Sequence, residues 1–406
     1  MRIGVYLSRP PIASGGAATF ETNIVRALQA KAQSLGWTLA CFVTDDGATS
    51  DEEVVVSDGI AVTVFRSVCK TSIGRTLWNH WCHSLGPSIR GATLSERISG
   101  WAGRLGLDLI YSPSPYAPCH LVPFFVTVWD LQHRRQPFFP EVSVAGFRWA
   151  DREAMYFQTL PRAAGIITGT LAGKEEVVRF YGIADERVIV IPQATPADAV
   201  KLANSEIVSA EEQFPYAIYP AQFWPHKNHV TLLRTWKLLE LRGNQQLHLI
   251  FTGSDHGNEA YIRQICRELG LSERVHFRGF VSRSDLLNLY GNAKMMVFPS
   301  LFGPDNIPPL EAMALGCPVI AARVPGVEEQ LQDGVIIVDG TREEQFADAI
   351  TELMENSTLT ERLKSRGAAI AESRTVSQYA ERLAIAFADF WRFRQTWSRR
   401  EKYVYP

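Results

Sequence analysis

The segment Phe298–Ala322, FPSLFGPDNIPPLEAMALGCPVIAA, decides which fold the sequence predicts. It begins at the end of an apolar strand and passes through a polar loop over residues 303–306. Pro308 and Pro309 then open a helix, because proline lacks the N–H group that would have no partner in the first helical turn. Gly316 ends this helix, and an apolar run begins the next strand. The segment therefore predicts a strand, a loop and a helix in direct succession.

Such a loop presents backbone N–H groups at the start of a helix, directly after a strand. The unpaired N–H groups and the helix dipole both favour an anion at this place. Glu311 is an acid in the first turn of an otherwise apolar helix. From the residues alone two interpretations stay open: Glu311 binds a ligand, or it only complements the helix dipole.

The composition is that of a globular protein. The chain has 406 residues, of which 46% are hydrophobic and 21% charged, a length that suggests two or three domains. A net charge of -2 argues against nucleic acid as the main partner. The six cysteines contain no CxxC pair, so we expect neither a zinc site nor a disulfide framework. This use of cysteine fits a reducing, cytoplasmic setting. The apolar run at the start of the sequence is too short for a signal peptide. No later run reaches the ~18 apolar residues of a membrane span, so any contact with a membrane would be peripheral.

Strand and helix patterns alternate along most of the chain, which predicts parallel, doubly wound α/β sheets. The acidic segment between residues 45 and 58 is expected to be a loop, and the pattern is lost over 193–214, which we expect to be a linker. The expected units are residues 1–192, the linker 193–214, residues 215–380 and a final helical segment, 381–406. Strands in the first unit are expected at 1–7, 38–43, 60–66, 109–112, 124–130, 165–168 and 188–191, with helices from about residue 19 and at 146–163 and 171–181.

The pattern Leu-Glu-Ala-Met-Ala-x-Gly-x-Pro-Val-Ile around Glu311 resembles the donor-nucleotide loop of the group 1 (family 4) retaining glycosyltransferases of bacterial polysaccharide assembly. The resemblance implies a GT-B fold, in which two Rossmann-like domains face each other across a cleft. The N-terminal domain would bind the acceptor, the C-terminal domain the nucleotide sugar. The final helix would cross back onto the N-terminal domain and use its aromatic residues in the core, although a basic and aromatic helix could also lie on a membrane surface.

In that family the loop reads Glu-Gly-Phe-Gly-x-Pro-x-x-Glu-Ala, and its second Glu, which hydrogen-bonds the ribose, matches Glu311. The first Glu falls on Gly303, and the nearest acid is Asp305. Lys227 matches the lysine of the family segment Gly-Arg-x-x-Pro-x-Lys, while Gln222 stands in place of its arginine. A structural lysine is disfavoured at the start of a helix by the dipole, which supports a role at the site.

Asp130 matches the acid of the family pattern Thr-x-His-Asp, with Trp129 in place of the histidine, and His133 close enough in sequence to reach the same space. Alternatively, Asp130 caps the turn that follows it. We therefore expect Lys227, Asp130 and Asp305 to act in catalysis. The expected donor-binding residues are Gly15, Gly16, Gln222, Lys227, Gly253, Phe280, Gly303, Asp305, Asn306, Ile307, Leu310 and Glu311.

The expected function is transfer of a sugar from a nucleotide sugar, UDP-glucose first, to a saccharide or lipid-linked saccharide, without a metal or a cofactor. Two alternatives stay open. A UDP-sugar 2-epimerase has the same shape, but it needs further acids and histidines at the cleft. A catalytically silent subunit that only binds nucleotide sugars would explain the departures at Gly303, Gln222 and Trp129.

Overall fold

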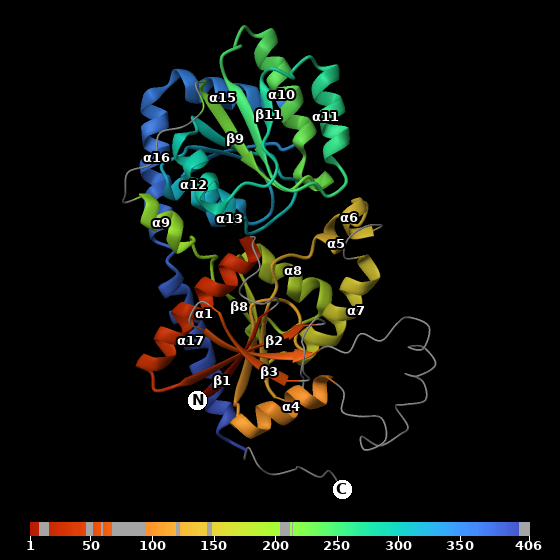
Figure 1. Cartoon of the computed structure of the whole chain (residues 1–406), viewed down its shortest axis with the longest axis vertical. Coiled ribbons are helices and arrows are strands. Elements are labelled where there is room, and N and C mark those ends of the chain that lie inside the picture. The colour runs from red at the N-terminus through yellow and green to blue at the C-terminus, as the bar shows by residue number, and fades with distance from the viewer. Residues whose placement is uncertain are drawn as a thin grey trace.

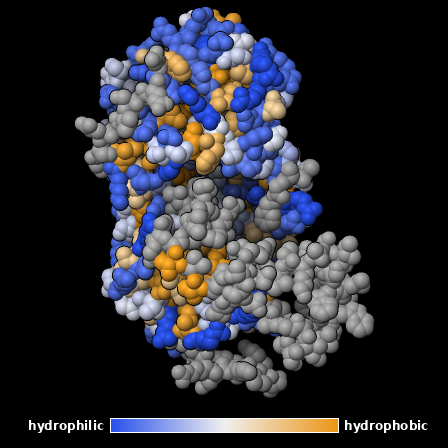
Figure 2. Space-filling view, in the orientation of Figure 1, coloured by the Kyte–Doolittle hydropathy of each residue, from blue (hydrophilic) through white to orange (hydrophobic). Residues whose placement is uncertain are grey.

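The computed structural model describes residues 1–7, 16–45, 52–57, 60–66, 94–118, 122–143, 148–203, 212 and 214–397. These residues form two lobes, each built on a β-sheet with helices packed around it (Figure 1). The N-terminal lobe is the lower one in Figure 1 and the C-terminal lobe the upper one. On the face seen in Figure 2 the upper lobe is mostly hydrophilic, as expected where the apolar side chains fill the interior.

The sheet of the N-terminal lobe has eight strands in the order β3-β4-β2-β1-β5-β6-β7-β8. All neighbours pair in parallel except β3 and β4, which are antiparallel. The strands are β1 (Arg2–Leu7), β2 (Thr38–Asp45), β3 (Glu52–Ser57), β4 (Ile60–Arg66), β5 (Leu109–Ser112), β6 (Phe124–Thr127), β7 (Gly165–Thr168) and β8 (Val188–Val190).

The expectation of a loop throughout residues 45–58 is wrong, because β3 lies within it. β3 forms the edge of the sheet, where Val54 and Val56 are 68% and 71% exposed. Backbone hydrogen bonds to β4 hold the strand in place. Such pairing does not require a regular pattern of apolar residues, so the sequence did not predict the strand.

Both faces of the N-terminal sheet are covered, so its central strands are apolar throughout. Along β1, Ile3, Val5 and Leu7 belong to one core cluster and Tyr6 to another, because successive side chains point to opposite faces. The first face packs against α1 (Gly16–Ser34), and the second against α4 (Leu94–Leu105), α7 (Trp149–Thr159) and α8 (Leu171–Tyr181). Two short helices, α5 (Gln132–Arg135) and α6 (Pro140–Ser143), follow β6.

The last helix, α17 (Val376–Arg394), returns to the N-terminal lobe and runs beside α1 (Figure 1). The Phe387 ring is fully buried and lies 5.5 Å from the ring of Tyr111 and 5.2 Å from that of Phe125. Phe393, by contrast, is 69% exposed. The aromatic residues of α17 are thus divided between the core and the surface.

The sheet of the C-terminal lobe has six parallel strands in the doubly wound order β11-β10-β9-β12-β13-β14. They are β9 (Tyr216–Pro220), β10 (His248–Thr252), β11 (Val275–Phe277), β12 (Met295–Phe298), β13 (Val319–Ala322) and β14 (Val335–Val338). The helices are α10 (His229–Leu241), α11 (Glu259–Glu268), α12 (Arg283–Asn292), α13 (Ile307–Ala314), α14 (Val327–Leu331), α15 (Glu343–Glu355) and α16 (Ser357–Glu372).

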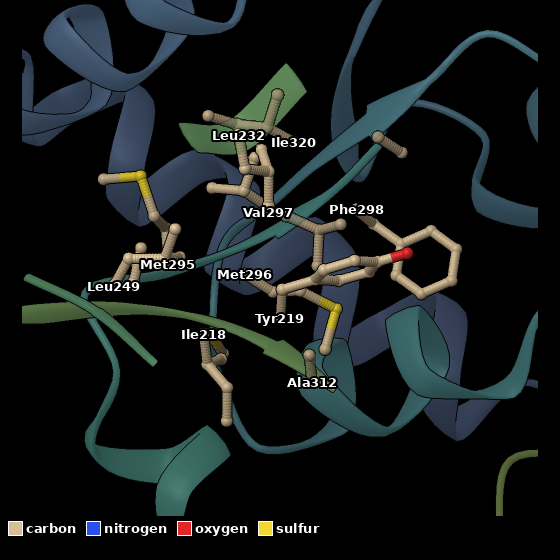
Figure 3. Packing of buried hydrophobic residues seen from close by; sticks show 14 of the residues in the cluster. Ile218, Tyr219, Leu232, Leu249, Met295, Met296, Val297, Phe298, Ala312 and Ile320 are labelled. Atoms are coloured by element: carbon tan, nitrogen blue, oxygen red, sulfur yellow. The ribbon is translucent and has the colours of Figure 1, made fainter. Parts of the chain in front are cut away.

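Strand β12 and helix α13 are anchored in the core of the C-terminal lobe. Met296 and Phe298 of β12 lie in one apolar cluster with Tyr219 of β9 and Ala312 of α13 (Figure 3). The loop between β12 and α13 therefore starts and ends on rigid elements.

Between the two sheets the chain forms α9 (Ala197–Ala203), a helix within the segment expected to be a linker. Its seven residues span too few turns to give a visible helical period. Within the described residues, no helix combines the length and apolarity that a bilayer crossing requires.

Candidate active site

The segment that opens α13 has the predicted order of strand, loop and helix. The helix begins at Ile307 with Asn306 as its N-cap residue and proline in its first turn. Gly303 has a φ of 125°, and its carbonyl accepts a 2.7 Å hydrogen bond from the Asn306 side chain. Only glycine adopts this φ without strain, so the turn depends on the residue that stands where the related loop has a glutamate.

A cavity of about 350 Å³ lies between the lobes next to this loop. Its lining brings together residues from both lobes, and it contains all three expected catalytic residues. The lining residues are Trp129, Asp130, Gln132, Glu141, Arg152, Trp224, His226, Lys227, Phe302, Gly303, Pro304, Asp305 and Asn306.

Lys227 ends a short 3₁₀ turn after β9 and is half-buried. Its Nζ lies 3.5 Å from Ser300 Oγ and 5.8 Å from the centre of the Phe298 ring. Burial lowers the pKa of the Lys227 ammonium to about 8, although the charges of Asp130 and Glu141 act in the opposite direction. Lys227 is therefore mostly charged at neutral pH and loses its proton under mildly basic conditions.

Asp130 caps the turn that follows it, as one of the two interpretations predicted, and it also lines the cavity. Its Oδ1 accepts a 3.0 Å hydrogen bond from the backbone N–H of Gln132 and lies 3.5 Å from Arg152 Nη1. His133, which was expected to reach the same space, does not line the cavity. Its ring is fully buried, and Nε2 lies 2.7 Å from Glu153 Oε1, so this expectation is wrong.

Asp305 lies where the two lobes meet. Its Oδ1 accepts a 3.1 Å hydrogen bond from the Gln330 side chain, and its carboxyl group sits against Gly169 of the N-terminal lobe, where an added Cβ would overlap Oδ2. Burial raises the pKa of Asp305 to about 7, with Arg374 lowering it and Glu329 raising it further. A neutral Asp305 can donate a hydrogen bond into the cavity, which a carboxylate cannot.

Glu311 is not among the residues that line the cavity. It is 5% exposed, and its Oε1 lies 2.7 Å from Arg283 Nη1. Arg283 in turn binds both carboxylate oxygens of Asp198, at 2.7 and 2.8 Å. The structure thus groups Lys227, Asp130 and Asp305 around one cavity and places the Glu311 carboxylate in a separate ionic cluster.

The sequence did not reveal the hydrogen-bonded pair of Glu141 and His226, which joins the lobes across the cavity. Glu141 of α6 accepts a 3.1 Å hydrogen bond from the backbone N–H of His226 and also pairs with the His226 ring. Burial would raise the pKa of Glu141, but the contacts with His226 hold it below its ordinary value. The two residues are 85 positions apart, and no local pattern connects them.

Comparison with known proteins gives the family. The model for glycosyl transferases group 1 matches residues 201–369. The chain belongs to the group 1 glycosyltransferases. One similar protein is the O-antigen chain mannosyltransferase B of Escherichia coli, 24% identical over 69% of this chain and 74% of that protein. Another is the O-antigen chain mannosyltransferase RfbU of Salmonella typhimurium, 26% identical over 49% of this chain and 54% of that protein. The match spans about half the length of RfbU and of two other related glycosyltransferases.

Solved structures show that this glycosyltransferase has the GT-B fold. Sucrose-phosphate synthase from Thermosynechococcus elongatus superposes with a TM-score of 0.69 at 19% identity, covering 96% of this chain and 99% of that one. Anabaena HepE in complex with UDP-glucose gives a TM-score of 0.65 at 18% identity, covering 96% and 100%.

Gln222, Gly253 and Phe280 of this glycosyltransferase were also expected to bind the donor. Gln222 is exposed and accepts a 2.9 Å hydrogen bond from the Trp224 indole. Gly253 has a φ of 146° and sits so close to the Ala221 carbonyl that an added Cβ would overlap it. Phe280 is 65% exposed. None of the three expected residues lines the cavity.

Gly15, Gly16, Ile307 and Leu310 were also expected to bind the donor. Gly16 is the first residue of α1, whereas Gly15 lies outside the described residues. Ile307 is half-buried and packs against the core of the N-terminal lobe, and Leu310 is fully buried. In the described parts of the chain, no group of three or more His, Cys, Asp or Glu side chains is arranged to hold a metal ion.

Proposed function

We propose that this glycosyltransferase moves a hexosyl group, with retention of configuration, from a nucleotide sugar to a saccharide or lipid-linked saccharide during polysaccharide assembly. The observation that carries the proposal is the position of Lys227, which lines the interlobe cavity together with residues 303–306 of the loop. Breaking the bond between the sugar and the diphosphate leaves negative charge on the phosphate oxygens. A cation and backbone N–H groups already in position stabilise that charge as it forms.

The other cavity residues suit the second half of the reaction. As the bond breaks, the sugar acquires positive charge at its anomeric carbon, which the Asp130 carboxylate would stabilise from the N-terminal lobe. The acceptor hydroxyl then forms the new bond and gives its proton to the leaving phosphate oxygen. Asp305, when protonated, would donate a hydrogen bond to the donor. Glu311 is proposed to bind the ribose and so to position the donor.

The sugar and the nucleotide are the finer part of the proposal. UDP-glucose is the first expectation, and a structure of similar fold holds UDP-glucose. The relatives named as O-antigen mannosyltransferases favour a mannose donor instead. We therefore propose a hexose in either case, with the donor to be selected by experiment. A lipid-linked acceptor would bring the enzyme to the inner face of the membrane.

The test measures release of nucleoside diphosphate from UDP-glucose and from GDP-mannose by wild type and two variants. Lys227→Ala and Glu311→Ala should each lose transfer and donor hydrolysis while the far-ultraviolet circular dichroism stays that of the wild type. Lys237→Ala is the matched control, because this lysine lies on α10 and pairs with Glu240, away from the cavity. Wild-type turnover of both donors by both active-site variants would overturn the proposal.

Two other outcomes would identify the alternatives. Donor binding in a calorimeter without hydrolysis or transfer would indicate a silent binding subunit, as the departures at Gly303 and Gln222 allow. Formation of an epimer from the UDP-sugar alone would indicate an epimerase.

A further inference from the structure

Arg283 occupies a position where an arginine is unfavourable unless it has a partner. It is the first residue of α12, behind the N-cap residue Ser282, and a cation near a helix N-terminus is opposed by the dipole. Two carboxylates from other elements offset this cost: Glu311 of α13 and Asp198 of α9. Arg283 thus ties the helix that begins at the cavity loop to the segment between the two sheets.

The two contacts of Arg283 are unequal. Asp198 is held through both of its oxygens and its side chain is 40% exposed. The contact with Glu311 runs through Oε1, and the Glu311 side chain is only 6% exposed. A buried carboxylate needs an opposite charge much more than an exposed one does. The Arg283 charge therefore matters more to Glu311 than to Asp198.

We propose that Arg283 is a positioning residue for the nucleotide sugar, which keeps the Glu311 carboxylate ionised and correctly aimed at the donor. This inference rests on the proposed function, in which Glu311 contacts the donor. It adds a residue that acts through Glu311 and that the sequence pattern did not indicate.

The charges around Glu311 fix the direction of the effect. Burial raises the pKa of Glu311, and Arg283 lowers it, while the charge of Asp198 raises it and the nearby Tyr290 hydroxyl lowers it. Removing the Arg283 charge should therefore raise the Glu311 pKa, by about 1–3 units for an opposite charge in direct contact. Removing the Asp198 charge should lower it or leave it unchanged.

These opposite directions separate our proposal from a structural one. If Arg283 served only to fasten α9 to the C-terminal lobe, loss of either partner would weaken the same connection. Arg283→Gln and Asp198→Asn would then weaken donor binding alike. If Arg283 acts through the ionisation of Glu311, the two variants must differ in their dependence on pH.

The experiment is calorimetric titration of UDP-glucose and GDP-mannose into the wild type, Arg283→Gln, Arg283→Lys, Asp198→Asn and Glu311→Gln between pH 5.5 and 8.5. A nucleotide sugar is used because its diphosphate has no proton to lose in this range. Asp305 and Lys227 titrate in all five proteins, so differences among the curves report on the Glu311 cluster.

We expect the pH at which affinity is half lost on acidification to move up by about 1–3 units in Arg283→Gln. Affinity should recover toward that of the wild type at the basic end, where Glu311 is ionised in both proteins. Arg283→Lys keeps the charge, so its midpoint should move less than that of Arg283→Gln. This variant also preserves a test if Arg283→Gln fails to fold. Asp198→Asn should keep the wild-type midpoint or move it down.

An unchanged midpoint in Arg283→Gln would overturn the inference. If Arg283→Gln fails to fold, equal losses of affinity at every pH in Arg283→Lys and Asp198→Asn would overturn it. Glu311→Gln distinguishes its failure from that of the proposed function. If Glu311→Gln binds donor as the wild type does, the proposed role of Glu311 is wrong. If it loses binding while the arginine variants keep the wild-type midpoint, only the inference about Arg283 is wrong.

Discussion

The charge of Lys227 should control the rate of donor cleavage, and its pKa makes that control visible in a pH profile. Because burial lowers the pKa to about 8, about 90% of the free enzyme carries the charge at pH 7 and about 10% at pH 9. We therefore expect kcat/KM for the donor to fall about tenfold between these values, since kcat/KM reports the ionisation of the free enzyme. The bound diphosphate stabilises the ammonium, so kcat should fall only at a higher pH.

Two substitutions test this explanation. Lys227→Ala should lower kcat about 10²–10³-fold at pH 7, as expected for the loss of one donor that stabilises developing charge. Lys227→Arg should lose the part of the decline that is centred near pH 8, because a guanidinium stays charged throughout the range, while the part that follows ionisation of Asp305 near pH 7 should remain. Initial rates of nucleoside diphosphate release from pH 6 to 10 provide the measurement, with Lys237→Ala as the control. A decline centred near pH 8 that is as large in Lys227→Arg as in the wild type would refute the assignment of this titration to Lys227.

Three further predictions concern the lobe contact and the core. Gly169→Ala should displace the Asp305 carboxyl and lower donor turnover about 10²-fold, and unchanged turnover would contradict the close contact. Because the pKa of Asp305 is raised to about 7, the folded protein holds this proton more tightly than the unfolded chain. The free energy of unfolding should therefore fall as pH rises from 4 to 7, by at most about 4 kcal/mol, and urea titrations of Asp305→Asn should show a smaller fall. Phe387→Ala should cost about 3–5 kcal/mol in urea unfolding, whereas the exposed Phe393→Ala should change stability by less than about 0.5 kcal/mol, and equal effects would contradict the packing of α17.

Elements with strong local signals were predicted from the sequence to the residue. Helix α8 has the predicted bounds of 171–181, because Thr170 accepts a hydrogen bond as its N-cap and Gly182 ends it with a φ of 63°. The strand, loop and helix around Glu311 were predicted for the same reason, since proline and glycine mark the boundaries. The resemblance to the family motifs selected Lys227, Asp130 and Asp305, which all line one cavity.

Features that depend on distant parts of the chain could not be predicted. The hydrogen-bonded contact of Glu141 with His226 arises from the way the lobes face each other, and neither residue stands in a pattern that identifies its partner. The expectation for His133 was wrong because Glu153 of α7 binds its ring within the N-terminal lobe. The sequence also gave no sign that Arg283 would hold Glu311, since that contact joins two helices.

A crystal structure of the enzyme with bound UDP-glucose or GDP-mannose tests the central claim most directly. We predict that the diphosphate lies in the interlobe cavity, with phosphate oxygens within hydrogen-bond distance of Lys227 Nζ and of backbone N–H groups between Gly303 and Ile307. A donor that fully occupies a different place, with its diphosphate away from Lys227, would contradict the account.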